Sequence, residues 1–224
     1  METEIRTFES LPYIVRYPRN YQLRQKYPAI LMLHGAGSRG TDPSTLLDNP
    51  ALMLTLEQKE FPFVLIAPQC HADTWFDLFE QLKRFTSAMA QESFVDADRF
   101  YLMGASMGGY CAWQLAMSMP ELFAAMVPIC GGGMYWNAAR LKHLPIWAFH
   151  GGLDNTVKVE ESIRMVEAVN KKGGNAKLTI YPENKHDAWT DTYSNPEVFA
   201  WLLSHKRQTA EICSDALQGS NLYG

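Results

Sequence analysis

The sequence predicts an α/β fold in which a mostly parallel sheet is covered by helices on both faces. Short, continuously apolar runs alternate with longer segments whose apolar residues recur at helical spacing. Continuous apolar runs are typical of strands that are buried on both faces, as the strands of a parallel sheet are. Hydrophobic residues make up 47% of the 224 residues, which is enough for one core. We therefore expect one domain over residues 1–224, with about residues 209–224 as a flexible tail.

The chain is expected to begin with an antiparallel hairpin, because two extended stretches, residues 5–9 and 13–17, are joined by a Leu-Pro step. The next apolar run, residues 29–33, ends abruptly at a small-residue loop that begins at His34, as a buried central strand would. A helix is expected to follow over residues 43–59.

The rest of the chain continues the alternation of strands and helices. Buried strands are expected at residues 63–67, 99–103, 123–129, 145–149 and 177–181. Helices are expected at residues 77–92, 106–119, 159–172 and 196–208. Pro120 ends the second of these helices, and Gly173 follows the third, as residues that stop a helix do.

Residues Gly104 to Gly108, with the sequence GASMG, match the G-x-S-x-G motif of a nucleophile elbow. A buried strand is expected directly before the motif and a helix directly after it, which is the context that the motif requires. The tight turn strains the backbone of the serine and needs small flanking residues. Ser106 is therefore the predicted nucleophile. A glycine-rich turn with a capping serine is the alternative explanation of these five letters alone.

A serine hydroxyl is a weak nucleophile and needs a base within hydrogen-bond reach, which follows later in the chain in this arrangement. His186 lies five residues beyond the last expected strand, where a loop at the carboxyl edge of the sheet should lie. It is the predicted base, with a solvated loop histidine as the alternative.

Asp154 is the predicted acid, because it lies in the loop that follows the strand at residues 145–149. A buried carboxylate there would fix the tautomer of the imidazole and stabilise the imidazolium. A turn aspartate that caps the following residues is one alternative. Asp187 is the rival acid, although a residue next to His186 in sequence cannot easily fold back under the imidazole.

A tetrahedral oxyanion needs two preorganised N–H donors. One should be the amide of Met107, directly after the nucleophile, and the other that of Ala36, in the loop after the first buried strand. A plain glycine-rich turn is the alternative explanation of the letters of that loop.

Four segments, LHGAGSRG, GASMGG, FHGGLDNTV and KHDAW, occur in an order that resembles small bacterial carboxylesterases of the α/β-hydrolase superfamily. The chain is similar over essentially its whole length to the phospholipase/carboxylesterase, dienelactone-hydrolase-like and feruloyl and acetyl-xylan esterase groups. The resemblance implies an α/β-hydrolase fold without a large lid and a triad of Ser106, Asp154 and His186. The elbow serine replaces the cysteine of the dienelactone hydrolases proper, which argues against that particular activity.

Without a lid, the site is expected to be an open cleft for soluble substrates with short acyl groups. Trp75, Trp136 and Trp189 are candidate walls that could stack on a phenolic acid or a sugar ring, although each could equally cover the core. The predicted function is a serine carboxylesterase that forms an acyl-enzyme on Ser106. A serine peptidase, thioesterase or lysophospholipase with the same triad stays open, as does a catalytically inactive binding protein of this fold.

The composition argues against several partners. The formal net charge is −4 with dispersed basic residues, so neither a nucleic acid nor an anionic membrane is expected to bind. The amino terminus, METEIRTFES, has no apolar signal-peptide core, which predicts a cytoplasmic location. The four cysteines show no ligand spacing, so we expect reduced thiols and neither a metal nor a cofactor.

Overall fold

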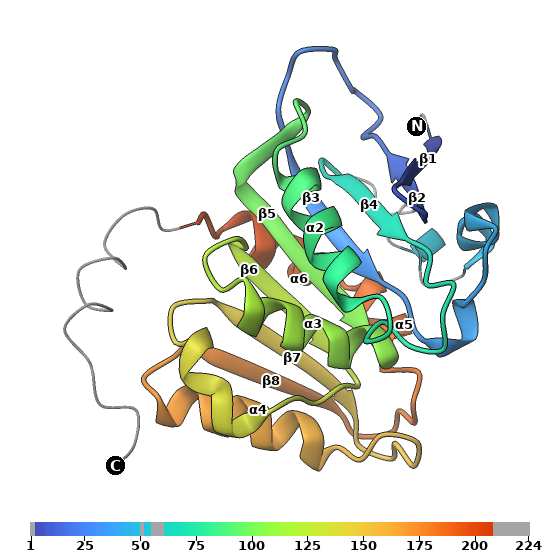
Figure 1. Ribbon diagram of the computed structural model, residues 1–224. Helices are drawn as coiled ribbons and strands as arrows, with labels where there is room; N and C mark the ends of the chain where they lie inside the picture. The colour runs from blue at the N-terminus through green and yellow to red at the C-terminus, as the bar shows by residue number, and fades with distance from the viewer. Residues whose placement is uncertain (1–2, 50–51, 55–60, 208–224) are drawn as a thin grey trace.

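The computed structural model describes residues 3–49, 52–54 and 61–207, which form one eight-stranded sheet with helices on both of its faces (Figure 1). The strand order is β1-β2-β4-β3-β5-β6-β7-β8. The strands are β1 (Thr3–Phe8), β2 (Leu11–Arg16), β3 (Tyr27–Leu33), β4 (Val64–Pro68), β5 (Val95–Ala105), β6 (Ala125–Ile129), β7 (Ile146–Gly151) and β8 (Ala176–Tyr181).

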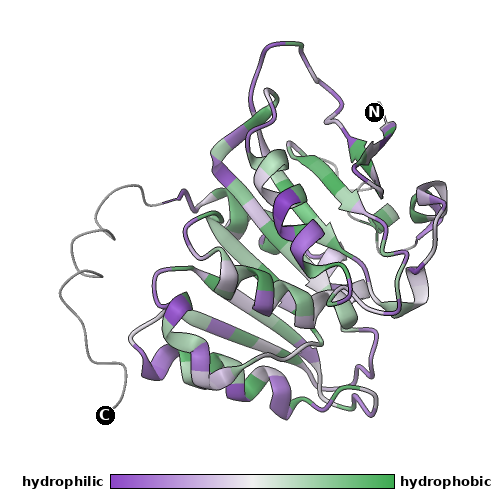
Figure 2. Cartoon of the chain, viewed as in Figure 1, coloured by the Kyte–Doolittle hydropathy of each residue, from purple (hydrophilic) through white to green (hydrophobic). Residues whose placement is uncertain are grey.

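The pairing of the strands confirms the predicted architecture. β1 pairs with β2 and β2 with β4 in antiparallel fashion, whereas every pair from β4 through β3, β5, β6 and β7 to β8 is parallel. Every residue of β3, β4 and β6 is buried, which explains why these strands are continuously apolar in sequence. The most hydrophobic ribbons in Figure 2 are accordingly the central strands.

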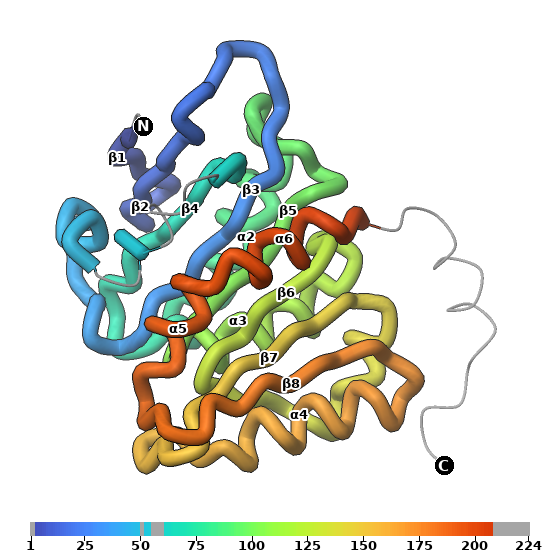
Figure 3. The backbone as a smooth tube through the Cα atoms, turned by 180° about the vertical axis from the view of Figure 1, so that it is seen from behind, coloured from blue at the N-terminus to red at the C-terminus, as the bar shows by residue number. Residues whose placement is uncertain are grey.

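Helices cover the two faces of the sheet separately. One face carries α2 (Phe79–Ala90), α3 (Met107–Ser118) and α4 (Glu160–Lys171), whose inner side chains belong to the first core cluster. The other face, seen from behind in Figure 3, carries α5 (Ala188–Ser194) and α6 (Pro196–Leu203), which pack in the second core cluster. The loops of the described residues contain the 3₁₀ helices η1 (Ala36–Ser38), η2 (Pro43–Asp48) and η3 (Tyr135–Leu141).

The helix expected over residues 43–59 differs from the structure in its described part. There η2 is followed by a separate helical turn at residues 52–54, and the remaining residues of that range lie outside the described chain. The Asp42 carboxylate accepts a hydrogen bond from an amide of the first turn, which starts η2, and the extended backbone of Asn49 ends it.

The carboxyl-terminal region differs from the prediction at two points. The expected last helix ends at Leu203, and the short helix α5 was not predicted at all. The expected tail, residues 209–224, lies outside the described chain. No helix of the described chain has both the length and the apolar character needed to cross a membrane.

Candidate active site

Ser106 lies at the sharp turn between β5 and α3 and has a backbone that non-glycine residues rarely adopt. Its φ is 55° and its ψ is −119°, a conformation that costs about 1–3 kcal/mol and persists only where the surroundings fix it. The Ser106 amide donates to the carbonyl of Ile129, 2.9 Å away, and the Ser106 carbonyl accepts from the amide of Tyr110 at 3.0 Å. β6 and α3 therefore hold the strained turn in place.

Two glycines allow the turn to pack against the neighbouring backbone. A Cβ atom added at Gly104 would lie 2.2 Å from the carbonyl oxygen of Gly108, and one added at Gly108 would lie 2.0 Å from that of Leu33. No side chain fits at either distance, because both obstacles are backbone atoms. The close contact of α3 with β3 and β5 therefore depends on these two glycines.

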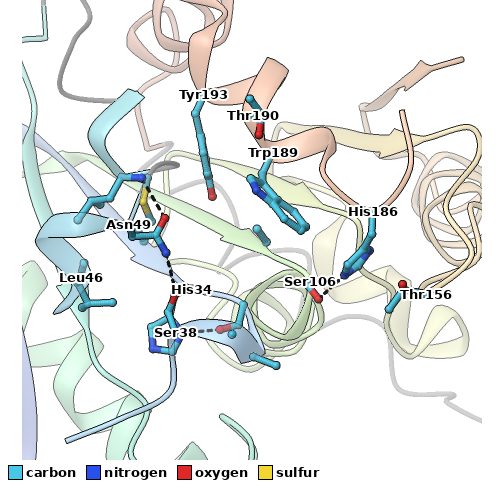
Figure 4. Close-up of a pocket in the computed structure, with 17 residues that line it drawn as sticks. His34, Ser38, Leu46, Asn49, Ser106, Thr156, His186, Trp189, Thr190 and Tyr193 are labelled. Carbon is cyan, nitrogen blue, oxygen red and sulfur yellow. Dashed lines mark hydrogen bonds between the residues drawn. The ribbon is translucent and has the colours of Figure 1, made fainter. Parts of the chain in front are cut away.

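The structure brings Ser106, His186 and Asp154 together in one chain of hydrogen bonds. His186 follows β8, and its Nε2 lies 2.8 Å from Ser106 Oγ (Figure 4). Its Nδ1 lies 2.7 Å from Oδ2 of Asp154, which follows β7. Oδ1 of Asp154 accepts hydrogen bonds from the amides of Thr156 and Val157 at 2.8 and 2.9 Å. Because Nδ1 faces a carboxylate it carries the proton, so Nε2 is free to accept from the serine hydroxyl.

The environment of Asp154 keeps its carboxylate ionised. Burial alone would raise its pKa, but the hydrogen bonds from His186 and from the amides of Val157 and Thr156 outweigh burial and lower the pKa below its ordinary value. The carboxylate is therefore able to fix the orientation of the imidazole and to stabilise a positive charge on it.

A second histidine, His150, lies beside Asp154 and was not predicted to support it. Its side chain is fully buried, its Nδ1 lies 2.7 Å from Ser162 Oγ, and its Nε2 lies 3.0 Å from the carbonyl oxygen of Val157 and 3.4 Å from Asp154 Oδ2. Burial lowers the pKa of His150, so the ring is neutral at neutral pH. The spacing of four residues between the two side chains was the only signal of this contact in the sequence.

One group of side chains in the described chain has the composition of a metal site. Donor atoms of Cys130, His150 and Asp154 lie within 4.8 Å of one another. Both ring nitrogens of His150 and both carboxylate oxygens of Asp154 already make hydrogen bonds. The group is thus committed to supporting the acid of the hydrogen-bonded chain, and the absence of a metal requirement stays a prediction.

Ala36 and Met107 begin η1 and α3, and the first N–H groups of a helix have no acceptor within the helix. The loop that carries Ala36 touches the elbow, since a Cβ atom added at Gly35 would lie 3.4 Å from Ser106 Cβ. Both amides thus belong to segments that meet at the nucleophile, as an oxyanion hole requires.

Hydrogen bonds of His34 and of the buried Trp75 anchor the loop before η1. His34 Nδ1 donates to the Gly35 carbonyl at 2.7 Å, and its Nε2 accepts from the amide of Cys70 at 3.0 Å. Burial lowers the pKa of His34 to about 4, so the ring stays neutral. The indole N–H of Trp75 donates to the His34 carbonyl at 3.0 Å. Trp75 is completely buried, so the expectation that it forms a wall of the site is wrong; it supports the loop instead.

The other two tryptophans also differ from each other. Trp136 lies in η3 with 69% of its surface exposed and does not line the pocket that contains Ser106. Trp189 does line it, and its ring lies edge-on to that of His186 with centroids 5.1 Å apart. Of the three candidate walls, only Trp189 therefore stays a proposed substrate contact.

The pocket that contains Ser106 and His186 has a volume of about 650 Å³ and is largely apolar. Trp189 and Tyr193 of α5 lie on one side of it, and the loop from His34 to Ser38 lies on the other (Figure 4). The short helix α5, which was not predicted, thus forms one side of the site.

A sequence profile of the dienelactone hydrolase family matches residues 67–211, more than half of the chain. The chain belongs to the dienelactone hydrolase family. Dipeptidyl-peptidase 5 of Porphyromonas gingivalis is 24% identical to this member of the family over 75% of this chain. A putative carboxymethylenebutenolidase of Escherichia coli O157:H7 is also 24% identical, over 66% of this chain. The chain spans only 32% and 53% of their respective lengths.

Solved structures agree with the assignment to this hydrolase family. A thermostable esterase is 32% identical, with a TM-score of 0.80, over 92% of this chain and 63% of its own. Est1E from Butyrivibrio proteoclasticus has a TM-score of 0.70 over 90% of this chain and 99% of its own, at 15% identity. An acylaminoacyl peptidase of Pyrococcus horikoshii has a TM-score of 0.68 over 94% of this chain and 42% of its own, at 13% identity. The last two likenesses support the α/β-hydrolase fold alone.

Proposed function

We propose that this member of the dienelactone hydrolase family is a serine carboxylesterase that acts on a small soluble ester through an acyl-enzyme on Ser106. The observation that carries the proposal is the unbroken chain from Ser106 Oγ through His186 to Asp154, with contacts of 2.8 and 2.7 Å. This chain supplies a nucleophile, a base and a buried anion in the relative positions that acyl transfer needs.

In the first half of the reaction, Ser106 Oγ attacks the carbonyl carbon while His186 Nε2 takes the hydroxyl proton. The amides of Ala36 and Met107 donate to the oxyanion of the tetrahedral intermediate. When the intermediate collapses, the bond to the alcohol oxygen breaks and His186 gives its proton to that oxygen. The alcohol leaves and the acyl group stays on Ser106.

In the second half, a water molecule attacks the acyl carbon and His186 takes its proton. The bond to Ser106 Oγ then breaks, and His186 returns the proton to the serine as the carboxylic acid leaves. Asp154 stays ionised throughout and stabilises the imidazolium of each intermediate. Every proton that moves passes through His186, so no cofactor enters the scheme.

A serine peptidase is the second candidate, and the observation in its favour is the likeness to dipeptidyl-peptidase 5. The same groups could attack an amide, a thioester or a lysophospholipid, since only the leaving group differs. A purely binding role fits less well, because a chain without catalytic use has no need of a strained serine paired with a histidine and a buried carboxylate.

The test is the Ser106→Ala variant with p-nitrophenyl acetate as substrate. We expect kcat to fall by several orders of magnitude, as it does when a nucleophile of this kind is removed. The matched control is Ser118→Ala, which removes a hydroxyl at the far end of α3, outside the pocket, and should stay within tenfold of the wild type. Turnover by Ser106→Ala near the wild-type rate would contradict the proposal. A faster reaction with peptide p-nitroanilides than with esters would favour the peptidase.

A further inference from the structure

We propose that the apolar pocket beside Ser106 binds the acyl chain of the substrate and selects an unbranched acyl group of medium length, such as hexanoyl or octanoyl. This inference rests on the proposed function, because it assigns one half of the ester to the pocket. It replaces the short acyl group that an open cleft would favour.

The direction of the pocket assigns it to the acyl half of the ester. The carbonyl oxygen must face the amides of Ala36 and Met107, and the alcohol oxygen must face His186, which protonates it. The acyl chain takes the remaining direction. In Figure 4, Leu46 and Asn49 lie on the opposite side of Ser106 from His186, so the pocket extends in that remaining direction.

The floor of the pocket is formed by the sheet itself. Met32, Ala67 and Ala105, from the ends of β3, β4 and β5, are buried members of the second core cluster and also line the pocket. Two of the three are alanines, which leave space above the strands. Protein interiors contain few voids larger than a water molecule, and an unfilled apolar cavity destabilises a fold. A pocket of about 650 Å³ that continues from the nucleophile onto the core is therefore fitted to a ligand.

The walls favour a hydrocarbon chain over a charged or sugar group. Leu46 lies on one side, Trp189 and Tyr193 of α5 lie on the other (Figure 4), and Leu52 adds to the apolar lining. Among the described lining residues, no aspartate, glutamate, lysine or arginine is present. The polar side chains of Ser38 and Asn49 make a hydrogen bond to each other, in which the Asn49 amide donates to the Ser38 hydroxyl at 2.6 Å.

The experiment compares two matched ester series with the wild-type protein. The first series lengthens the acyl chain from p-nitrophenyl acetate to the dodecanoate, and the second lengthens the alcohol of an acetate ester by the same number of carbons. Burial of one methylene is worth about fourfold in kcat/KM. We expect kcat/KM to rise by about a hundredfold or more from acetate to hexanoate or octanoate in the acyl series alone, and to fall for the longest chains.

Two neighbouring variants locate the effect. Leu46→Trp fills the pocket and should lower the ratio of kcat/KM for octanoate to that for acetate by tenfold or more. Leu47→Trp places the same side chain at the next residue of η2, which does not line the pocket, and should leave the ratio unchanged. Thermal unfolding of both variants checks that each is folded.

The possible failures are distinct. Hydrolysis of the acetate without a rise along the acyl series, or a rise along the alcohol series instead, would overturn the acyl pocket and leave the esterase in place. An equal loss of chain preference in both variants would also overturn it. Absence of turnover for every ester would overturn the proposed function itself.

Discussion

Replacement of Asp154 by asparagine tests the acid of the proposed triad at almost constant volume. Oδ1 of Asp154 accepts two backbone hydrogen bonds, from Thr156 and Val157, at 2.8 and 2.9 Å. In the variant the amide oxygen must take this position, because an NH₂ group cannot face two N–H donors. The NH₂ group then faces His186 Nδ1, which has to become the acceptor.

The consequence for catalysis follows from the tautomer. With Nδ1 as acceptor, the proton of a neutral His186 sits on Nε2, which then cannot accept the proton of Ser106. We expect kcat for p-nitrophenyl acetate to fall about 10⁴-fold, the loss that the wrong tautomer causes in a serine protease triad. The fold should survive, since the backbone hydrogen bonds of the loop remain.

The matched control is Asp187→Asn, which neutralises the rival acid next to His186 and at the start of α5. Initial rates of ester hydrolysis and thermal unfolding should be measured for both variants at neutral pH. Asp187→Asn should retain activity within tenfold of the wild type. The reasoning fails if Asp154→Asn remains within tenfold of the wild type while folded, or if Asp187→Asn is the variant that loses activity.

Two further predictions concern stability. Gly108→Ala should lower the melting temperature strongly or prevent folding, because its Cβ would lie 2.0 Å from the Leu33 carbonyl oxygen. The control Gly37→Ala, whose Cβ meets nothing within 4 Å, should be tolerated. Equal melting temperatures of the two variants would contradict this prediction. The pKa of His34 is about 4 when folded and about 6.5 when unfolded. The unfolded chain therefore binds a proton that the folded chain excludes, so the free energy of unfolding falls as the pH drops from about 6.5 to about 4. In urea titrations across this range, His34→Gln should show a shallower fall than the wild type, and parallel slopes would refute the assignment.

The strands and the three residues of the hydrogen-bonded chain could be found from sequence because topology places them. Strands of a parallel sheet bring their carboxyl ends to one edge, so Ser106, Asp154 and His186, which follow β5, β7 and β8, had to meet there. The buried strands were recognisable because both of their faces are apolar. Helix ends and 3₁₀ turns were not, because they depend on caps such as the Asp42 carboxylate rather than on periodicity.

The role of His150 was missed for a related reason. The sequence does not distinguish a buried histidine from a solvated one. His150 is held in the interior by contacts with Ser162 and Val157, which only the folded chain brings together. The tryptophans show the same limit: Trp75 packs in the core, and its buried N–H is satisfied by the carbonyl of His34, 41 residues away in sequence. Such partners leave no periodic signal.

The sequence predicted the reactive residues of the pocket but not its shape, and the short helix α5 explains the difference. The helix has seven residues, AWTDTYS, with too few apolar positions for a periodic pattern, yet it begins two residues after His186 and carries both Trp189 and Tyr193. His186, the proposed base, and two residues that line the proposed acyl pocket therefore belong to one short segment. The edge-on contact of Trp189 with the imidazole couples them directly. A substitution that shifts α5 to admit a longer acyl chain should then also move His186 relative to Ser106, so that changes in chain-length preference and in kcat appear together.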